Sequence, residues 1–167
     1  MKAADLKQGL NALWDNIAEG WRHLKDSAAG ALTRFKSDEH SGLPDKSQVD
    51  DAAYQPFGGW SLLGGDVFED AERLVVRLEL PGMQKSDLVI EVIDDALVVS
   101  GQKRFAQESS DGRWRIMQCA YGQFRRVVPL AVPVRAEEAR ASYVNGVLRV
   151  ELPKAEQKRR RVNIGTD

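Results

Sequence analysis

Hydrophobic residues at the start of the chain recur at steps of three or four positions. From residue 6 to residue 35 they are Leu6, Leu10, Leu13, Ile17, Trp21, Leu24, Ala28, Leu32 and Phe35. This spacing places them on one face of an α-helix, and charged residues fill many of the positions between them. The pattern therefore predicts an amphipathic helical arm, which Gly20 or Gly30 can interrupt. Its apolar face has to be covered by another surface.

The hydrophobic period changes to two in the second part of the chain. Leu and Val residues within 74–80 alternate mainly with polar ones until Pro81-Gly82 ends the run, and Asn145-Gly146 favours a tight hairpin turn. Similar runs predict short strands over residues 88–93, 97–102, 113–117, 124–130, 139–144 and 147–152. Because no helical pattern lies between these runs, we predict an all-β fold, an antiparallel two-layer β-sandwich.

The stretch between the two patterns is rich in Ser, Asp, Gly and Pro, which is typical of a linker. Its hydrophobic residues form islands at Tyr54, Phe57 and 60–63, and we place the start of the folded domain after Gly65. The predicted regions are an arm and linker at 1–65, a β-sandwich at 66–153 and a flexible charged tail at 154–167.

The predicted tail has two features that bear on binding. The basic run 158–161 lacks interleaved aromatic residues for base stacking, so a solvating tail is favoured over a nucleic-acid site. Val162 and Ile164 stand two positions apart, so both side chains project to one side of an extended chain.

The charge and the termini limit the partners and the compartment. With 24 basic and 25 acidic side chains the net charge is −1, so no overall field attracts nucleic acid or anionic lipid. The N-terminus lacks the apolar core of a signal peptide, and no stretch approaches the roughly 20 apolar residues of a membrane span. Cys119 cannot form an internal disulfide, and a half-buried strand cysteine is its simplest interpretation. We therefore expect a cytoplasmic protein that binds neither membrane nor nucleic acid.

Residues for catalysis or metal binding are not grouped along the chain. His23 and His40 lie outside the predicted sandwich, so no base is placed near Cys119 or a serine. The Gly pairs of the linker lack the Lys-Ser/Thr of a phosphate loop, and Asp94-Asp95 fits a turn whose side chains diverge. The sequence predicts no enzyme, no cofactor and no metal site.

Four short motifs occur in a fixed order in the second part of the chain. They are LELPGM (78–83), YGQFRR (121–126), ASYVNGVL (141–148) and VNI (162–164). Together they resemble the bacterial small heat-shock protein family, over about residues 66–154 and the tail motif. The first 65 residues share with the family only the general type of its N-terminal arm and no motif, since the N-terminal arms of this family vary widely.

The resemblance implies an immunoglobulin-like sandwich, the α-crystallin domain, that dimerises by strand exchange. Segment 113–117 would pair with the first strand of a neighbour, near residues 66–68. The implied dimer-interface residues are Arg113, Trp114, Arg115, Ile116 and Arg126, the last matching the F-x-R arginine of the family. The tail motif would dock in a groove of another dimer, lined by Ile90, Val92, Ala139 and Ala141.

The function implied by the resemblance is that of an ATP-independent holdase, which binds unfolding proteins under heat or other stress and prevents their aggregation. Its partners would be further copies in an oligomer of dimers, unfolded client proteins, and ATP-dependent chaperones for refolding. The expected client-binding residues are Leu10, Leu13, Trp14, Ile17, Trp21, Leu24, Phe35, Phe57 and Trp60.

Three other classes stay open at this point. The nearest is a monomeric β-sandwich interaction module, similar to a co-chaperone that docks on a larger chaperone. The V-x-I tail and the long apolar arm argue against it. The others are an enzyme with an unfamiliar site and a nucleic-acid binder that uses the basic tail.

Overall fold

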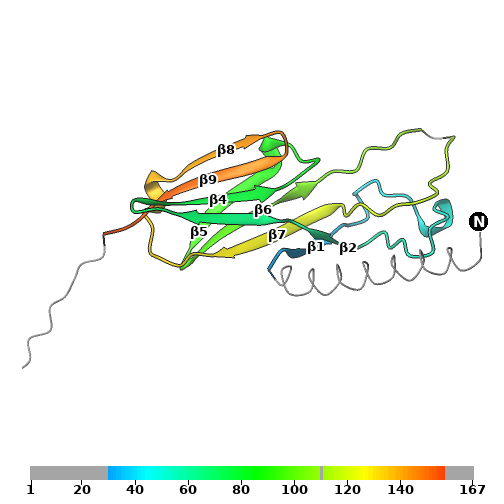
Figure 1. Cartoon of the computed structure of the whole chain (residues 1–167). Coiled ribbons are helices and arrows are strands. Elements are labelled where there is room, and N and C mark those ends of the chain that lie inside the picture. Colours follow the sequence, from blue (N-terminus) through cyan, green and yellow to red (C-terminus); the bar gives the residue numbers. More distant parts are fainter. Residues whose placement is uncertain (1–29, 110, 157–167) are drawn as a thin grey trace, which may run out of the picture.

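A computed structural model describes residues 30–109 and 111–156, which form two β-sheets packed face to face (Figure 1). This confirms the predicted all-β sandwich. The predicted helical arm up to residue 29, and with it His23, lies outside the described residues. So do the basic run 158–161 and the tail motif of Val162 and Ile164.

One sheet has five strands in the order β2-β1-β7-β6-β5, and all neighbours in it are antiparallel. Its strands are β1 (Leu32–Lys36), β2 (Gly59–Leu62), β5 (Leu88–Ile93), β6 (Ala96–Lys103) and β7 (Gly122–Pro129). The other sheet has four strands in the order β3-β4-β9-β8. They are β3 (Gly65–Glu69), β4 (Arg73–Glu79), β8 (Arg140–Val144) and β9 (Val147–Pro153). Short 3₁₀ turns are η1 (Lys46–Gln48), η2 (Lys85–Asp87) and η3 (Ala136–Glu138).

Local turn chemistry sets the register of two hairpins. Asn145 and Gly146 both have positive φ, 52° and 78°, as a two-residue type I′ hairpin requires, and they pair Val144 with Val147. Asp94 also has a positive φ, 50°, in the turn between β5 and β6. The strands predicted at 88–93 and on both sides of Asn145-Gly146 are therefore confirmed.

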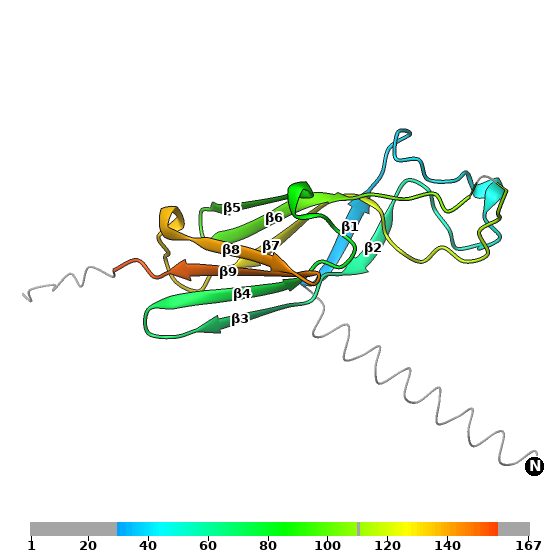
Figure 2. The same cartoon turned by 90° about the horizontal axis from the view of Figure 1, so that it is seen from above.

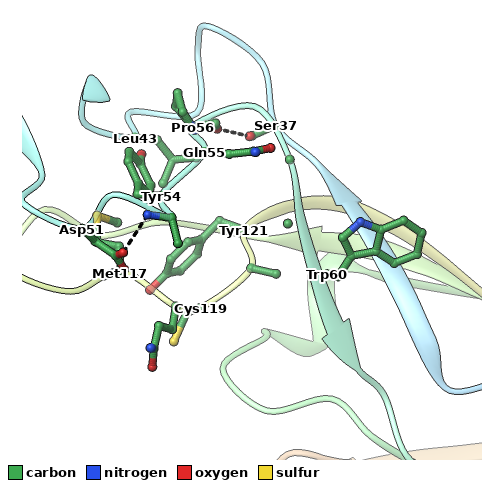
Figure 3. Close-up of a pocket in the computed structure, with 15 residues that line it drawn as sticks. Ser37, Leu43, Asp51, Tyr54, Gln55, Pro56, Trp60, Met117, Cys119 and Tyr121 are labelled. Atoms are coloured by element: carbon green, nitrogen blue, oxygen red, sulfur yellow. Dashed lines mark hydrogen bonds between the residues drawn. The ribbon is translucent and has the colours of Figure 1, made fainter. Parts of the chain in front are cut away.

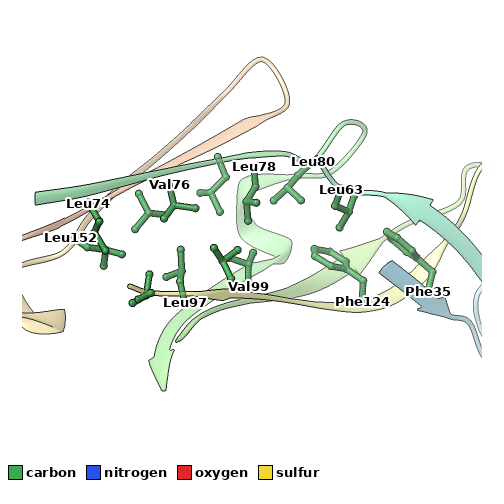
Figure 4. Packing of buried hydrophobic residues seen from close by; sticks show 14 of the residues in the cluster. Phe35, Leu63, Leu74, Val76, Leu78, Leu80, Leu97, Val99, Phe124 and Leu152 are labelled. Atoms are coloured by element: carbon green, nitrogen blue, oxygen red, sulfur yellow. The ribbon is translucent and has the colours of Figure 1, made fainter. Parts of the chain in front are cut away.

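Hydrophobic side chains from both sheets fill the space between them (Figure 4). The Phe35 and Phe124 rings stack with centroids 5.2 Å apart at one end, where β1 pairs with β7. Burying each large side chain stabilises the fold by roughly 1.5–3 kcal/mol. The buried core cluster is Phe35, Leu63, Leu74, Val76, Leu78, Leu80, Leu97, Val99, Ala120, Phe124, Val128, Leu130, Leu148, Val150 and Leu152.

The strand β1 corrects the prediction for its part of the arm. Residues Leu32–Lys36 form a strand, although Leu32 and Phe35 continue the helical spacing of the preceding residues. Thr33 and Phe35 point into the sandwich, while Arg34 and Lys36 point outward. Pairing with β7 and stacking of Phe35 on Phe124 outweigh the local helical pattern. Two segments of the predicted arm and linker, β1 and β2, thus belong to the five-stranded sheet.

The chain passes from one sheet to the other between β2 and β3. Gly65, the first residue of β3, lies so close to β4 that a Cβ there would be 2.9 Å from the Arg77 carbonyl oxygen and would overlap the Leu78 side chain. Only glycine allows β3 to approach β4 this closely at its first residue. The position of β3 matters because it forms one edge of the four-stranded sheet.

Candidate assembly and binding surfaces

The strand β3 presents an open edge. It pairs with β4 on one side, and among residues 30–109 and 111–156 no strand pairs with its other side. All five of its residues are exposed, including the large side chains of Val67 and Phe68. Such an edge offers unpaired backbone groups to an added strand.

The segment predicted to form the exchanged strand, 113–117, is not a strand in this structure. Trp114 makes an isolated parallel bridge with Val49, and its carbonyl oxygen accepts the Asp50 N–H at 2.9 Å. Arg113 and Arg115 both form ion pairs with the Asp50 carboxylate. The hydrogen bond from Arg113, followed by that from Arg115, holds the pKa of Asp50 below its usual range. The segments around Val49 and Trp114 are joined by one bridge only and have no neighbouring strands, so they do not form a β-ladder.

Arg126 points toward the inside of the sandwich, and Arg125 points away from it. The Nη1 of Arg126 donates to the Val127 carbonyl at 2.9 Å, and the Nε of Arg126 donates to the Leu63 carbonyl at 3.4 Å. In the part of the chain that the structure describes, no carboxylate forms an ion pair with this guanidinium. Burial lowers the pKa of Arg126, because the charged form loses contact with water.

Four large apolar side chains lie exposed on the outer side of β1, β2 and the residues just before β2. Leu32 is 52% exposed and stands opposite Leu62, which is 43% exposed, across the β1–β2 pair. Phe57 is 62% exposed and Trp60 is 60% exposed, and together with Arg34 they line a hollow of about 410 Å³. We call Leu32, Phe57, Trp60 and Leu62 the outer apolar patch.

Two predicted client-binding residues, Phe57 and Trp60, thus lie together on the surface, and a third does not. Phe35 is only 1% exposed, because it faces the core from β1 and stacks on Phe124. Its assignment as a client-binding residue is therefore wrong. The other six residues named for this role lie before residue 30, outside the described residues.

The residues predicted to line a tail-docking groove lie on the edge strands β5 and β8 or directly beside them. Figure 2 shows these two strands on the same side of the sandwich. Ile90, Val92 and Ala139 are half-buried and pack against the core, while Ala141 is exposed.

A pocket of about 490 Å³ lies between the segment before β2 and the segment before β7 (Figure 3). Cys119 lies at this pocket and is exposed in a loop, which corrects the expectation of a half-buried strand cysteine. Burial, and to a lesser degree Cys119, raises the pKa of Tyr121 beside it. Ser37 Oγ is already committed, since it donates to the Pro56 carbonyl.

The described residues contain neither a metal-ligating cluster nor a membrane-spanning helix. Across residues 30–109 and 111–156, no group of three or more His, Cys, Asp and Glu side chains is arranged to hold a metal ion. No helix within these same ranges has the length and apolar content needed to cross a membrane.

A known family model recognises the part of the sandwich that begins in β3. The model of the Hsp20/alpha crystallin family matches residues 66–165, from β3 to the tail. The chain belongs to the Hsp20 family. This confirms the resemblance to small heat-shock proteins, and it leaves β1, β2 and the outer apolar patch outside the matched part of this Hsp20-family chain.

Curated relatives of this Hsp20-family chain include plant proteins. It is 33% identical over 97 residues to the 17.8 kDa class I heat shock protein of Arabidopsis thaliana, and the matched region covers 58% of this chain and 62% of that protein. It is 37% identical over 92 residues to the 16.9 kDa class I heat shock protein 1 of Triticum aestivum, covering 54% and 61%. The chain thus spans about three fifths of the length of these relatives.

Solved structures of the Hsp20 family resemble the sandwich. Heat shock protein 16.0 from Schizosaccharomyces pombe is 29% identical with a TM-score of 0.52, covering 63% of this chain and 97% of its own. A small heat-shock protein from Xylella fastidiosa, described as having a distinct high order structure, is 25% identical with a TM-score of 0.50. It covers 64% of this chain and 98% of its own.

Proposed function

We propose that this Hsp20-family chain is an ATP-independent holdase that binds unfolding proteins and prevents their aggregation under heat or other stress. The observation that carries the proposal is the outer apolar patch. It exposes two aromatic and two aliphatic side chains on the outer side of β1, β2 and the residues just before β2. Unfolding proteins expose apolar surface of their own, and burial of apolar area is favourable by roughly 25 cal/mol per Å² whatever the client sequence.

The arm would add to this surface. Leu10, Leu13, Trp14, Ile17, Trp21 and Leu24 have the spacing of one apolar helix face, and they precede β1 in the sequence. Clients would therefore meet an apolar surface that extends from the arm to Trp60. Binding by apolar contact alone needs no catalytic residue and no nucleotide.

Assembly begins with dimers in this proposal. Segment 113–117, with Trp114 and Ile116 at its centre, pairs with the open β3 edge of a neighbour, and that pairing removes an exposed edge from each chain. Arg126 supports the presence of a partner, because its half-buried guanidinium bonds only to carbonyls in the described residues. A carboxylate from the partner would satisfy its charge.

Dimers then join through the tails. Val162 and Ile164 of one dimer dock along β5 and β8 of another, on Ile90, Val92, Ala139 and Ala141. Held clients pass to ATP-dependent chaperones for refolding. A cytoplasmic location is part of the proposal, and the free thiol of Cys119 supports it.

The test measures light scattering of a heated model client without ATP. We expect the double variant Phe57→Ser and Trp60→Ser to need about two- to five-fold more chaperone for the same protection, since it loses two large apolar contacts. The matched control is Val89→Ser with Val144→Ser, which removes two exposed valines away from the patch and should match the parent. Equal protection by both double variants would contradict the role of the patch, and a native mass of 18.6 kDa would exclude the assembly.

A further inference from the structure

The linker residues 47–51 contact the exchange segment 113–117 of the same chain. The contacts include backbone and side chains. Asp50 N–H donates to the Trp114 carbonyl at 2.9 Å, and the Met117 N–H donates to Asp51 Oδ2 at 3.4 Å. The two segments are more than 60 residues apart in sequence, so this pairing is a feature of the tertiary fold.

One carboxylate binds two arginines in this pairing. Arg113 and Arg115 are two positions apart, so an extended chain presents both side chains on one side. Arg113 Nε binds Asp50 Oδ1, and Arg115 Nη1 binds Asp50 Oδ2, so each carboxylate oxygen takes one guanidinium. Arg113 Nη2 donates further to the Ser47 carbonyl at 3.2 Å. The linker therefore binds an extended segment with arginines at alternate positions.

The opposite side of the exchange segment is held within its own loop. The Trp114 ring lies 5.5 Å from the Phe105 ring, and Phe105 lies 5.2 Å from Tyr121, which begins the approach to β7. These aromatic contacts are made within residues 105–121 and involve none of the linker residues 47–51. The contacts that must break for the segment to leave the linker are thus the ones made by residues 47–51.

The same backbone groups serve both pairings. An N–H donates one good hydrogen bond, so the Met117 N–H cannot bond to Asp51 and to a β3 carbonyl of a neighbour at the same time. In an extended segment the backbone groups of Trp114 and Met117 face opposite edges, so a ladder with β3 along either edge would need groups that the linker already binds. Pairing with the linker and exchange onto a neighbour exclude one another at these positions.

We infer that residues 47–51 form an intramolecular binding site for the exchange segment, with Asp50 as the residue that recognises Arg113 and Arg115. The inference rests on the proposed exchange of 113–117 between copies. In the dissociated chain the linker holds the segment, and in the dimer the β3 edge of the neighbour replaces the linker. The linker thereby competes with a second copy and sets the concentration at which dimers form.

The test compares Asp50→Asn with Asp38→Asn in the full chain. Asp38 lies in the same linker, and its side chain accepts only the His40 N–H in the described contacts, so the control carries the same change of charge. Native mass spectrometry of a dilution series gives the concentration at which half of the chains are dissociated. Loss of two exposed ion pairs should lower that concentration about two- to ten-fold for Asp50→Asn. Asp38→Asn should match the parent.

Hydrogen exchange at the amide of residue 50 gives a second readout. In dilute, dissociated protein this N–H is bonded to the Trp114 carbonyl, so it should exchange more slowly in the parent than in Asp50→Asn. Equal dissociation concentrations together with equal exchange at residue 50 would overturn the inference.

A third variant separates this inference from the proposed exchange. Ile116→Pro removes a backbone donor from the centre of segment 113–117 and should abolish dimers. If Ile116→Pro dissociates the protein while Asp50→Asn behaves like the parent, the linker site is wrong and strand exchange stands. If Ile116→Pro stays dimeric, the exchange proposal itself fails.

Discussion

Arg125 and Arg126 are neighbours in β7 with opposite environments. Alternation along a strand predicts that only one of the two faces the inside, and the structure identifies Arg126 as that residue. Arg126 donates to the Val127 carbonyl, whereas no ion pair or hydrogen bond from the Arg125 side chain is found in the described part of the chain. The Arg126 guanidinium is half-buried and bonds to carbonyl groups, so shortening this side chain should lower the stability of the fold.

The expected result of Arg126→Ala is a loss of roughly 1–2 kcal/mol in the free energy of unfolding, since charged hydrogen bonds to the two carbonyls are lost. The variant should also form looser assemblies of broader size, because the carboxylate that we propose on the partner would lose its guanidinium. Arg125→Ala is the matched control and should change stability by less than about 0.5 kcal/mol. Melting temperature and particle size decide the matter, and two variants with equal, small effects would remove Arg126 from the interface.

At the scale of elements, Gly65 controls how β3 lies against β4. A methyl group there meets the Arg77 carbonyl and the Leu78 side chain. Gly65→Ala should therefore push the start of β3 away from β4 and lower the free energy of unfolding by roughly 1–3 kcal/mol, as other overpacked sites do.

Gly112→Ala is the control for this change, because a Cβ at Gly112 meets nothing within 4 Å. Urea unfolding of both variants gives the comparison. A Gly65→Ala protein with the parent's midpoint would show that β3 tolerates displacement, and the close approach would then have no energetic role.

The strands differ in how well they can be predicted from the sequence. Strands β4 to β9 follow from a local period of two and from turn dipeptides such as Asn145-Gly146, whose positive φ values belong to two adjacent residues. Strand β1 could not be foreseen in this way, because Leu32 and Phe35 fit the helical spacing and only Phe124, far along the chain, decides the outcome.

The residues of the candidate surfaces also differ in whether a local sequence pattern can predict them. The sequence predicts Phe57 and Trp60 as client-binding residues because they are large apolar residues in a polar linker, and the structure exposes both. The sequence alone does not separate them from Tyr54 and Leu63, which lie in the same linker and are buried. Asp50 carries no local signal, since one Asp in an Asp-rich linker looks like any other. Its importance comes from Arg113 and Arg115, which lie 63 and 65 positions away.

At the scale of the whole molecule, the stability of shortened chains shows where the folded unit begins. A chain that begins at Gly65 loses Phe35 and Leu63 from the core cluster and uncovers Phe124. We expect it to lose at least about 3 kcal/mol of stability relative to a chain that begins at Gly30, by analogy with removal of a buried Phe. Urea unfolding of the two truncated chains measures the difference.

The same pair of truncated chains also separates the arm from the outer apolar patch. The chain that begins at Gly30 keeps Leu32, Phe57, Trp60 and Leu62, so its remaining client protection reports on the patch alone. Equal urea midpoints for the two chains would mean that β1 and β2 only cover the sandwich without stabilising it.

Strand β1 has one more consequence, which concerns unwanted growth of the sheet. A holdase works among unfolding chains, and any long bare strand edge would let such a chain add itself and then recruit the next. Here the chain's own β1 pairs with β7 at Phe35 and Lys36, and the outermost strand becomes β2, with only four residues and a glycine at its start. Clients of the proposed holdase could thus adhere to side chains on the face of this sheet while finding little backbone to pair with at its β2 edge.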